Sequence, residues 1–229
     1  MAGRVDDANI GDNTSMGERD VGQAGTLVSD MFGQGQSIDN SLLGCRSPID
    51  HTLSMLPESL RTTRHALRPI SRGDAEEIFH GYAQDSEVSR YTMWTPHKNL
   101  TETEKFVDGC LATSPDLART YAICDQAGGF RGLFGLRHVK PYHIEFGYVL
   151  AHRWWRQGIM TEVLTEAVNA LLAQDTCFRI SGVCDVDNIG SARVMEKAGL
   201  LREGVLRRWI IHPNISSQPR DCLLYAKVK

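Results

Sequence analysis

The sequence predicts a mixed α/β domain whose strands are mostly antiparallel, and three observations support this. Strand-like and helix-like segments follow one another from Thr62 to the C-terminus. A strand, a basic turn containing glycine and a long amphipathic helix come in direct succession between Ile144 and Gln174. Before them, three strand-like segments separated by turn residues predict an antiparallel meander.

The first 60 residues differ from the rest in composition. They are rich in Gly, Ser, Asp, Asn and Gln, contain no lysine, and have Phe32 as their only aromatic residue. Such a segment buries too little apolar surface to offset the entropy of ordering it. We therefore expect residues 1–60 to be a disordered or loosely docked tail and residues 61–229 to form one domain. Because globular patterning begins just past Met55, we also hypothesise that Met55 is the native start.

Bulk composition excludes several classes of protein. A net charge of -3 and a pI near 6.2 argue against a general nucleic-acid binder. No apolar run approaches the roughly 20 residues of a membrane span, and the start lacks the pattern of a secretory signal. The six cysteines show no metal-ligand spacing and are expected to be reduced core thiols. We expect a cytoplasmic protein without a metal or a membrane or nucleic-acid partner.

The first half of the domain is predicted to contain a strand and two helices. Arg64 to Ile70 has the pattern of a short strand. Ser71 and Asp74 resemble a capping box at the start of a helix that runs to about Gln84. Thr101 and Glu104 repeat this signature before a second amphipathic helix.

The meander follows. Its first two strands, Arg119 to Cys124 and Arg131 to Val139, flank a turn with two glycines that suits a hairpin. Its third strand, Tyr142 to Leu150, leads into the glycine-containing turn.

The remaining elements alternate before ending in two strands. The helix from Gly158 to about Gln174 has an apolar stripe at the helical period. After it we expect a strand over Phe178 to Val186, a helix over Ile189 to Ala198 capped by Gly199, and strands over Arg202 to His212 and Asp221 to Val228.

The turn at Gly158 has the features of a phosphate-binding site. The first N–H groups of a helix lack intrahelical partners, and the helix dipole is positive there, so a strand–turn–helix can seat a phosphate. Arg156 can add a charge-assisted bond to such a phosphate. The other reading of the turn alone is an ordinary connection in which Gly158 is a turn residue.

From about Arg64 to Lys229 the chain resembles GNAT-superfamily N-acetyltransferases, in particular the ribosomal-protein N-terminal acetyltransferase branch. The matching motifs are Glu145-Phe146-Gly147-Tyr148, Trp154-Trp155, Thr161-Glu162, Asn188 with Ser191, Glu196-Lys197-Ala198-Gly199, and Pro213-Asn214-Ile215 before Arg220-Asp221. The resemblance implies a central, mostly antiparallel sheet that splays between strands four and five and is flanked by about four helices. It also implies that acetyl-CoA binds in the splay as co-substrate and that an acceptor amine approaches from the opposite face.

In the family's phosphate loop, Gly158 matches the central glycine. Trp155 and Met160 depart from the usual Gln or Arg and the usual small residue at the loop's two ends. The departures matter little if backbone N–H groups make most of the phosphate contacts. The resemblance implies these donor-binding residues: Tyr148, Val149, Leu150, Arg156, Gln157, Gly158, Ile159, Met160, Thr161, Asn188 and Ser191. In the family, a bulge in the fourth strand, here at residues 148–150, offers backbone N–H groups to the donor.

Two residues are candidates for proton transfer. Glu145 is costly on an otherwise apolar strand unless it is used or paired, so it is the candidate base; the alternative is a structural carboxylate paired with a basic neighbour. Many relatives carry a tyrosine acid where this chain has Met195. Ser191 lies on the same helix face and is the implied substitute, with helix capping as the alternative.

The resemblance also points to an acceptor groove. Its implied residues are Tyr91, Trp94, Asn214 and Arg220. The aromatic loop between the first two predicted helices, which contains Tyr91 and Trp94, could instead pack on the sheet, and Arg220 could pair with Asp221 or Glu145.

The expected function is acetyl-CoA-dependent N-acetylation of a primary amine, either a protein N-terminus or a small amine such as a polyamine, amino acid or aminoglycoside. Loss of tyrosine at Met195 keeps open an acyl-CoA-binding regulatory module without turnover. A structural domain without a CoA site is the remaining alternative. A monomer and a homodimer are both compatible with the sequence.

Overall fold

The computed structural model describes residues 56–229. Residues 1–55, with most of the expected tail and the hypothesis about Met55, lie outside the described residues. The last residues assigned to the tail are packed, because Leu56 and Leu60 are 5% and 8% exposed and belong to the main core. These two leucines bury enough apolar surface to dock the end of the expected tail, and the domain boundary at residue 61 stays a prediction.

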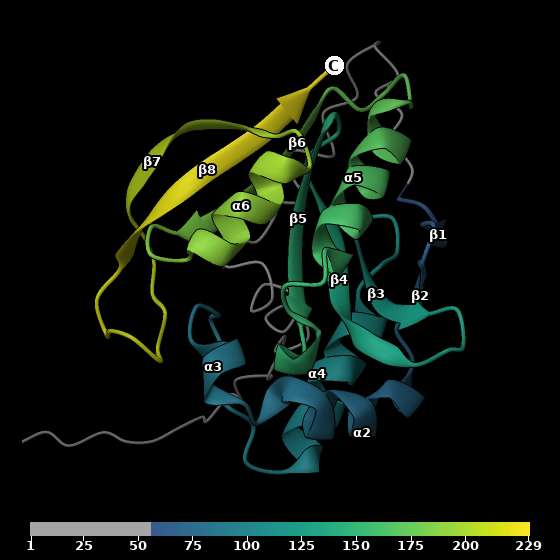
Figure 1. The fold of residues 1–229 in the computed structure, drawn as a ribbon, viewed down its shortest axis with the longest axis vertical. Coiled ribbons are helices and arrows are strands. Elements are labelled where there is room, and N and C mark those ends of the chain that lie inside the picture. Colours follow the sequence, from purple (N-terminus) through teal and green to yellow (C-terminus); the bar gives the residue numbers. More distant parts are fainter. Residues whose placement is uncertain (1–55) are drawn as a thin grey trace, which may run out of the picture.

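Within the described part of the chain, eight strands form one sheet (Figure 1). They are β1 (Leu60–Arg61), β2 (His65–Pro69), β3 (Ala118–Asp125), β4 (Phe130–Lys140), β5 (His143–Leu150), β6 (Arg179–Asp185), β7 (Leu201–Ile210) and β8 (Arg220–Val228). Their order is β1-β2-β3-β4-β5-β6-β8-β7, and every neighbouring pair is antiparallel except β5 with β6. The predicted mixed fold and its β3–β5 meander are confirmed.

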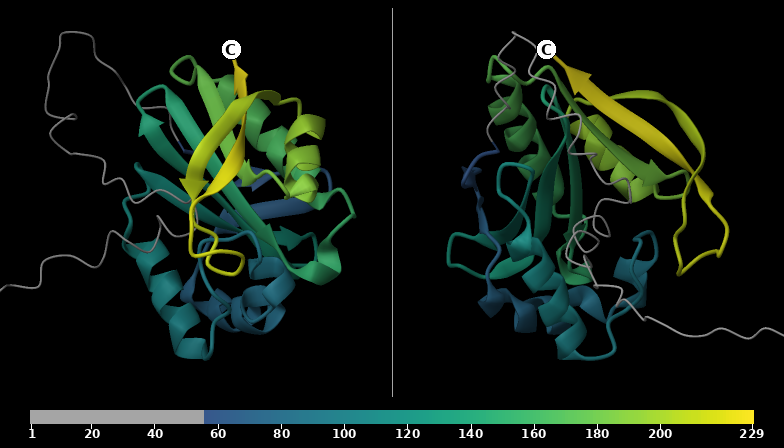
Figure 2. Two further views of the ribbon diagram at one scale, coloured as in Figure 1. Left: turned by 90° about the vertical axis from the view of Figure 1, so that its left-hand side faces the viewer. Right: turned by 180° about the vertical axis from the view of Figure 1, so that it is seen from behind.

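Helices cover both faces of this sheet (Figures 1 and 2). One face carries α2 (Ala75–Ile78) with a π-helical continuation (Phe79–Ala83), α3 (Ser86–Ser89) and α4 (Leu100–Ala112); the other carries α5 (Ile159–Leu172) and α6 (Ile189–Lys197). Neighbouring residues of β3 serve the two cores, Tyr121 packing in the cluster with α5 and Ala122 in the cluster with α2 and α4. Strand side chains alternate between faces, so the central strands are buried on both sides.

The ends of the helices follow local chemistry, with one correction. The capping-box contact of Asp74 is confirmed, since its Oδ2 accepts from the N–H of Ser71 at 2.7 Å. The cap predicted at Thr101 is wrong: the N-cap of α4 is Asn99, two residues earlier, and its side chain accepts from the N–H of Glu102 at 3.1 Å. Asparagine is at least as good an N-cap as threonine, and the Glu102 carboxylate accepts from the N–H of Lys98 at 2.9 Å.

Two short elements, β1 and α3, are absent from the sequence prediction. They have two and four residues. Neither is long enough to show a hydrophobic period. None of the helices within residues 56–229 has the length and apolar character needed to span a bilayer.

The parallel pair β5 and β6 separates soon after it forms. Its ladder contains three residue pairs, from His143 with Arg179 to Glu145 with Ser181. The next residue of β5, Phe146, lies against the next residue of β6, Gly182, and a Cβ on that glycine would be 2.5 Å from the phenyl ring. The aromatic ring therefore occupies the space of a side chain at the point where the strands diverge, and the predicted splay is present here.

Candidate active site

A cavity of about 790 Å³ lies where β5 and β6 diverge. Its walls come from β5, β6, the start of α5, α6 and the segment after α3. The residues predicted from the sequence that line it are Tyr91, Glu145, Tyr148, Val149, Leu150, Arg156, Gln157, Gly158, Ile159, Met160, Thr161, Asn188 and Ser191. The splay thus brings the candidate donor-binding, catalytic and one of the acceptor residues to a single cavity.

The turn before α5 has an unusual backbone. Arg156 has a φ of 60° and Gly158 a φ of 73°, and α5 begins at Ile159. The left-handed region suits glycine but strains an arginine by about 1–3 kcal/mol. Alternation of conformations in such a turn can bring successive N–H groups to one side and form a concave anion site. Both Gly158 and Ile159 line the cavity.

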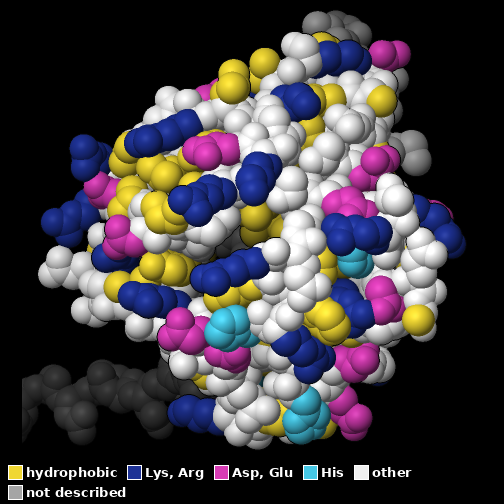
Figure 3. Space-filling model, viewed as in Figure 1, with side chains coloured by type: hydrophobic (Ala, Val, Ile, Leu, Met, Phe, Trp, Pro, Cys, Tyr) yellow, Lys and Arg dark blue, Asp and Glu magenta, His cyan; other side chains and the backbone are white. Residues whose placement is uncertain are grey.

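Four basic side chains line the same cavity: Arg90, Arg156, Arg193 and Lys197. Within residues 56–229 none of them forms an ion pair. Figure 3 shows Lys and Arg side chains around the hollow between α5 and α6. Unpaired cations around a cavity favour an anionic ligand.

A pair of hydroxyl groups bridges β5 and α6. Tyr148 Oη lies 2.8 Å from Ser191 Oγ and also donates to the Ser191 carbonyl at 3.3 Å. Burial raises the pKa of the tyrosine hydroxyl, so it stays protonated. Burial likewise raises the pKa of the neighbouring Cys184 thiol to about 12, against a lowering contribution from the Ser191 hydroxyl. The site therefore holds a cluster of neutral proton donors.

Met195 is a core residue and only 1% exposed. It lies one turn beyond Ser191 on α6. The N–H of Ser191 is capped by the side chain of Asn188 at 3.1 Å, so the capping at this helix start comes from Asn188 rather than from the serine hydroxyl. That hydroxyl is directed to Tyr148 instead.

Glu145 is held by a neighbouring cation. Arg137 on β4 donates from Nε to Glu145 Oε2 at 2.9 Å and forms an ion pair with the same carboxylate. The two residues face each other in the β4–β5 ladder. The Glu145 side chain is 14% exposed and lines the cavity. It is thus paired with a basic neighbour, as in the alternative of a structural carboxylate, and it is also accessible from the cavity.

The edge of β5 faces the cavity because β6 has turned away. The β4–β5 register is continuous from Gly132 with Leu150 to Arg137 with Glu145, and its irregularity lies between His138 and Lys140. The bulge expected at residues 148–150 is therefore not seen in the ladder. Gly132 instead permits a close approach, since a Cβ there would be 2.1 Å from the carbonyl oxygen of Val149.

The other expected acceptor residues do not line the cavity: Trp94 and Asn214 lie in loops, and Arg220 is the first residue of β8. Trp94 packs against Tyr82, with ring centroids 6.2 Å apart, and against a core cluster that includes residues of β3 and β4, as in the alternative in which the loop packs on the sheet. The Asn214 amide donates to the carbonyls of Ser89 and Trp94 at 2.7 and 2.8 Å. Through these hydrogen bonds, Asn214 connects the β7–β8 loop to the end of α3 and the segment after it.

Arg220 has partners that the sequence did not suggest. Its Nε donates to Asp185 Oδ2 and its Nη2 to Asp187 Oδ2, both at 2.6 Å. Pairing with Asp221 or Glu145 is thus wrong, since Asp221 bonds Arg207 and Glu145 bonds Arg137. Arg220 anchors the end of β6 beside the cavity.

Two features were missed by the sequence analysis. Tyr148 was expected to act through its backbone, but its hydroxyl reaches α6. Arg64 was read as the first residue of a strand, but its guanidinium reaches the turn before α5. The sequence signal for this contact was Glu162, an acidic residue at the start of that helix and outside its apolar stripe, which could have indicated a cationic partner.

Comparison with known proteins agrees with this geometry. A family profile described as "Acetyltransferase (GNAT) domain" matches residues 64–201. The protein of Bacillus subtilis (strain 168) named "Uncharacterized N-acetyltransferase YoaA" is 29% identical over 185 residues, which cover 74% of this chain and 96% of that protein.

Solved structures share the fold at low sequence identity. One is the acetyltransferase of Salmonella typhimurium described as modifying the N-terminal serine of 50S ribosomal subunit protein L7/L12, with 20% identity, a TM-score of 0.65, and coverage of 75% of this chain and 99% of that one. Another is the spermidine N-acetyltransferase of Vibrio cholerae in complex with CoA and spermine, with 18% identity, a TM-score of 0.61, and coverage of 72% and 95%.

Proposed function

The chain belongs to the GNAT acetyltransferase family and is an N-acetyltransferase; from this premise we propose that it transfers the acetyl group of acetyl-CoA to the α-amine of a protein N-terminus. The observation that carries the proposal is the single cavity in the β5–β6 splay. It joins the left-handed turn before α5 to the Tyr148–Ser191 hydroxyl pair.

The donor end of the cavity fits an anionic, elongated molecule. The N–H groups around Gly158 and the first turn of α5 would hold the pyrophosphate, helped by the positive end of the helix dipole. Arg156, Arg193 and Lys197 would supply compensating charge. The free edge of β5 at residues 148–150 would pair with the amide groups of the pantetheine arm.

Chemistry requires a neutral amine to attack the thioester carbon, so that a C–N bond forms and the C–S bond breaks. The amine loses a proton and the departing thiolate gains one. Ser191, hydrogen-bonded to Tyr148, is the candidate donor to the sulfur. It takes the place of the acid that Met195 cannot provide.

Glu145 is the candidate base, and it would accept the amine proton through water. Its ion pair with Arg137 fixes the carboxylate at the cavity wall. Because one oxygen is committed to the guanidinium, the second, Oε1, is the one available to a water molecule. Removing the carboxylate should affect chemistry more than binding.

Charge on the cavity wall favours a peptide N-terminus over a polyamine. Three acidic residues line the cavity: Glu87, Glu145 and Asp187. The last two are already held by Arg137 and Arg220, which leaves Glu87 as the acidic lining residue without an ion pair within residues 56–229. With Arg156, Arg193 and Lys197 facing the CoA phosphates, Arg90 is the basic residue left to the acceptor, so a polycation would find little complementary charge here. The fold shared with an acetyltransferase of an N-terminal serine is in keeping with this acceptor.

A thiol-release assay with acetyl-CoA tests the proposal across a panel of amines. Peptides beginning with serine or alanine should release CoA, and the same peptides with blocked N-termini should not. Spermine should give a lower kcat/KM than the best peptide. A higher kcat/KM for spermine would overturn the acceptor assignment, and CoA binding without release from any amine would favour a regulatory module.

Two variants assign the roles. Glu145→Gln and Ser191→Ala should each lower kcat while the KM for acetyl-CoA changes little. Arg72→Gln, which breaks an ion pair with Asp108 on exposed side chains away from the cavity, is the matched control. Near-wild-type rates for both site variants across the pH range would contradict the assignments.

A further inference from the structure

Arg64 connects the segment before β2 to the turn before α5. Its Nε donates to Glu162 Oε2 at 2.6 Å, and its Nη2 and Nη1 lie 3.3 and 3.4 Å from the carbonyl oxygen of Gln157. Arg64 does not line the cavity, whereas Gln157 and Gly158 do. The guanidinium therefore contacts the turn from outside the cavity.

The contact with the Gln157 carbonyl determines the orientation of the next N–H group. In a planar trans peptide the C=O of one residue and the N–H of the next point in opposite directions. A carbonyl of Gln157 drawn toward Arg64 therefore directs the N–H of Gly158 away from Arg64, to the side on which the cavity lies. Gln157 itself lies between two left-handed residues, Arg156 and Gly158.

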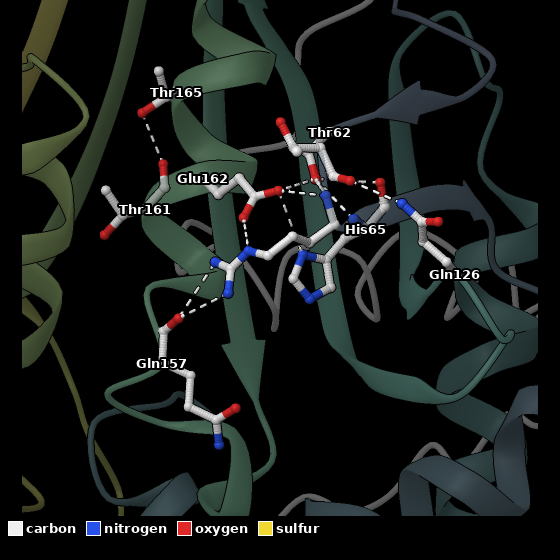
Figure 4. Close-up of polar contacts among 9 residues, drawn as sticks. Thr62, His65, Gln126, Gln157, Thr161, Glu162 and Thr165 are labelled. Atoms are coloured by element: carbon white, nitrogen blue, oxygen red, sulfur yellow. Dashed lines mark hydrogen bonds and ion pairs between the residues drawn. The ribbon is translucent and has the colours of Figure 1, made fainter.

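Arg64 also neutralises a charge that would disfavour an anion. Glu162 is in the first turn of α5, where a free carboxylate would repel a phosphate bound at the same helix end. Its oxygens accept from Thr62 Oγ1 at 2.5 Å, Arg64 N–H at 2.8 Å and Arg64 Nε (Figure 4). Burial disfavours the charged form, but these hydrogen bonds outweigh it and lower the pKa of Glu162 to about 2.

We propose that Arg64 is a positioning residue for the acyl donor: it orients the Gln157–Gly158 peptide and masks Glu162, so that the start of α5 accepts the phosphates of CoA. This inference rests on the proposed function. The arginine touches the turn and the carboxylate, and acts on the ligand only through them.

The test compares two donors that differ in phosphate. Arg64→Gln should weaken CoA binding and raise the KM for acetyl-CoA about 10- to 100-fold, the range for losing a charged hydrogen bond. Kinetics with S-acetyl-pantetheine, which lacks phosphates, should remain those of the wild type. Arg64→Lys keeps the charge beside Glu162 but cannot bridge both partners, so it should lose less.

A second substitution separates the two effects. In a Glu162→Gln background no carboxylate is left to mask, so Arg64→Gln should cost less there than in the wild type. The control Arg72→Gln should leave the kinetics with both donors unchanged. Tm and circular dichroism establish that each variant is folded before its kinetics are compared. If Arg64→Gln does not fold, Arg64→Lys is used in its place.

The outcomes are distinct. An equal loss with both donors, or an unchanged affinity for CoA in Arg64→Gln and Arg64→Lys, would overturn the inference and leave the proposed function standing. A wild-type chain that does not bind CoA would refute the proposed function and the inference with it.

Discussion

Replacing Gly182 by alanine tests whether the cavity depends on the room that this glycine leaves for Phe146. The new Cβ would lie 2.5 and 2.6 Å from two carbons of the phenyl ring. Carbon atoms in contact normally stay about 3.5–4.0 Å apart. The ring cannot easily retreat, because Phe134, Phe146 and Tyr148 form a stacked row with centroid distances of 6.4 and 6.2 Å.

Overpacking of this kind costs about 1–3 kcal/mol. For a protein of this size each kcal/mol lowers Tm by about 2–4 °C, so a central cost of about 2 kcal/mol predicts a loss of about 4–8 °C. The clash also pushes the row toward Tyr148, whose hydroxyl bonds Ser191. We therefore expect kcat to fall as well.

Thermal unfolding and the thiol-release assay measure both effects, with Gly204→Ala on β7 as control. A Cβ at Gly204 has no atom within 4 Å. In the Gly182→Ala background, Phe146→Leu should restore part of the lost stability by removing ring atoms. A Gly182→Ala protein as stable and as active as Gly204→Ala would refute the reasoning that the ring needs this space.

Three further predictions follow from the same contacts. Tyr148→Phe keeps the ring and loses the hydroxyl, so kcat should fall about tenfold with little change in the KM for acetyl-CoA, as steady-state kinetics would show. If Ser191→Ala and the double variant lose no more than Tyr148→Phe alone, the hydroxyls act as one unit. The folded-state pKa of Glu162 is lowered, so its contribution to stability is fully present above its ordinary pKa of 4.5 and is lost as pH falls toward about 2. The free energy of unfolding, measured by denaturant titration, should fall over that pH range in the wild type and fall less steeply in Glu162→Gln. Parallel pH profiles of the two proteins would contradict the assignment. Asn214→Ala frees the segment after α3 and should raise the acceptor KM but not the donor KM; equal changes in both would argue against that role.

The order of the major elements could be predicted because each carries a local signal. The apolar stripe of α5, the glycine turn between β3 and β4 and the capping box at Asp74 are all properties of a few consecutive residues. Gly199, with a φ of 83° after α6, belongs to the same class. Local propensity and periodicity are enough for such features.

What escaped prediction depends on contacts between distant segments. Arg64 and Glu162 are 98 residues apart, and Arg220 and Asp185 are 35 apart. Several basic residues could have satisfied each carboxylate, and only the sheet order selects one. The Tyr148 hydroxyl was missed for the same reason, since its partner Ser191 is 43 residues away on α6.

The central claim is that the cavity in the β5–β6 splay transfers acetyl from acetyl-CoA to an α-amine. Mass spectrometry tests it most directly, using a peptide that begins with serine and carries one internal lysine, incubated with acetyl-CoA and the full chain. We predict one added acetyl group, located by fragmentation on the N-terminal amine, and strongly reduced product with Ser191→Ala. An unmodified peptide, or an acetyl group found on the lysine alone, would contradict the account.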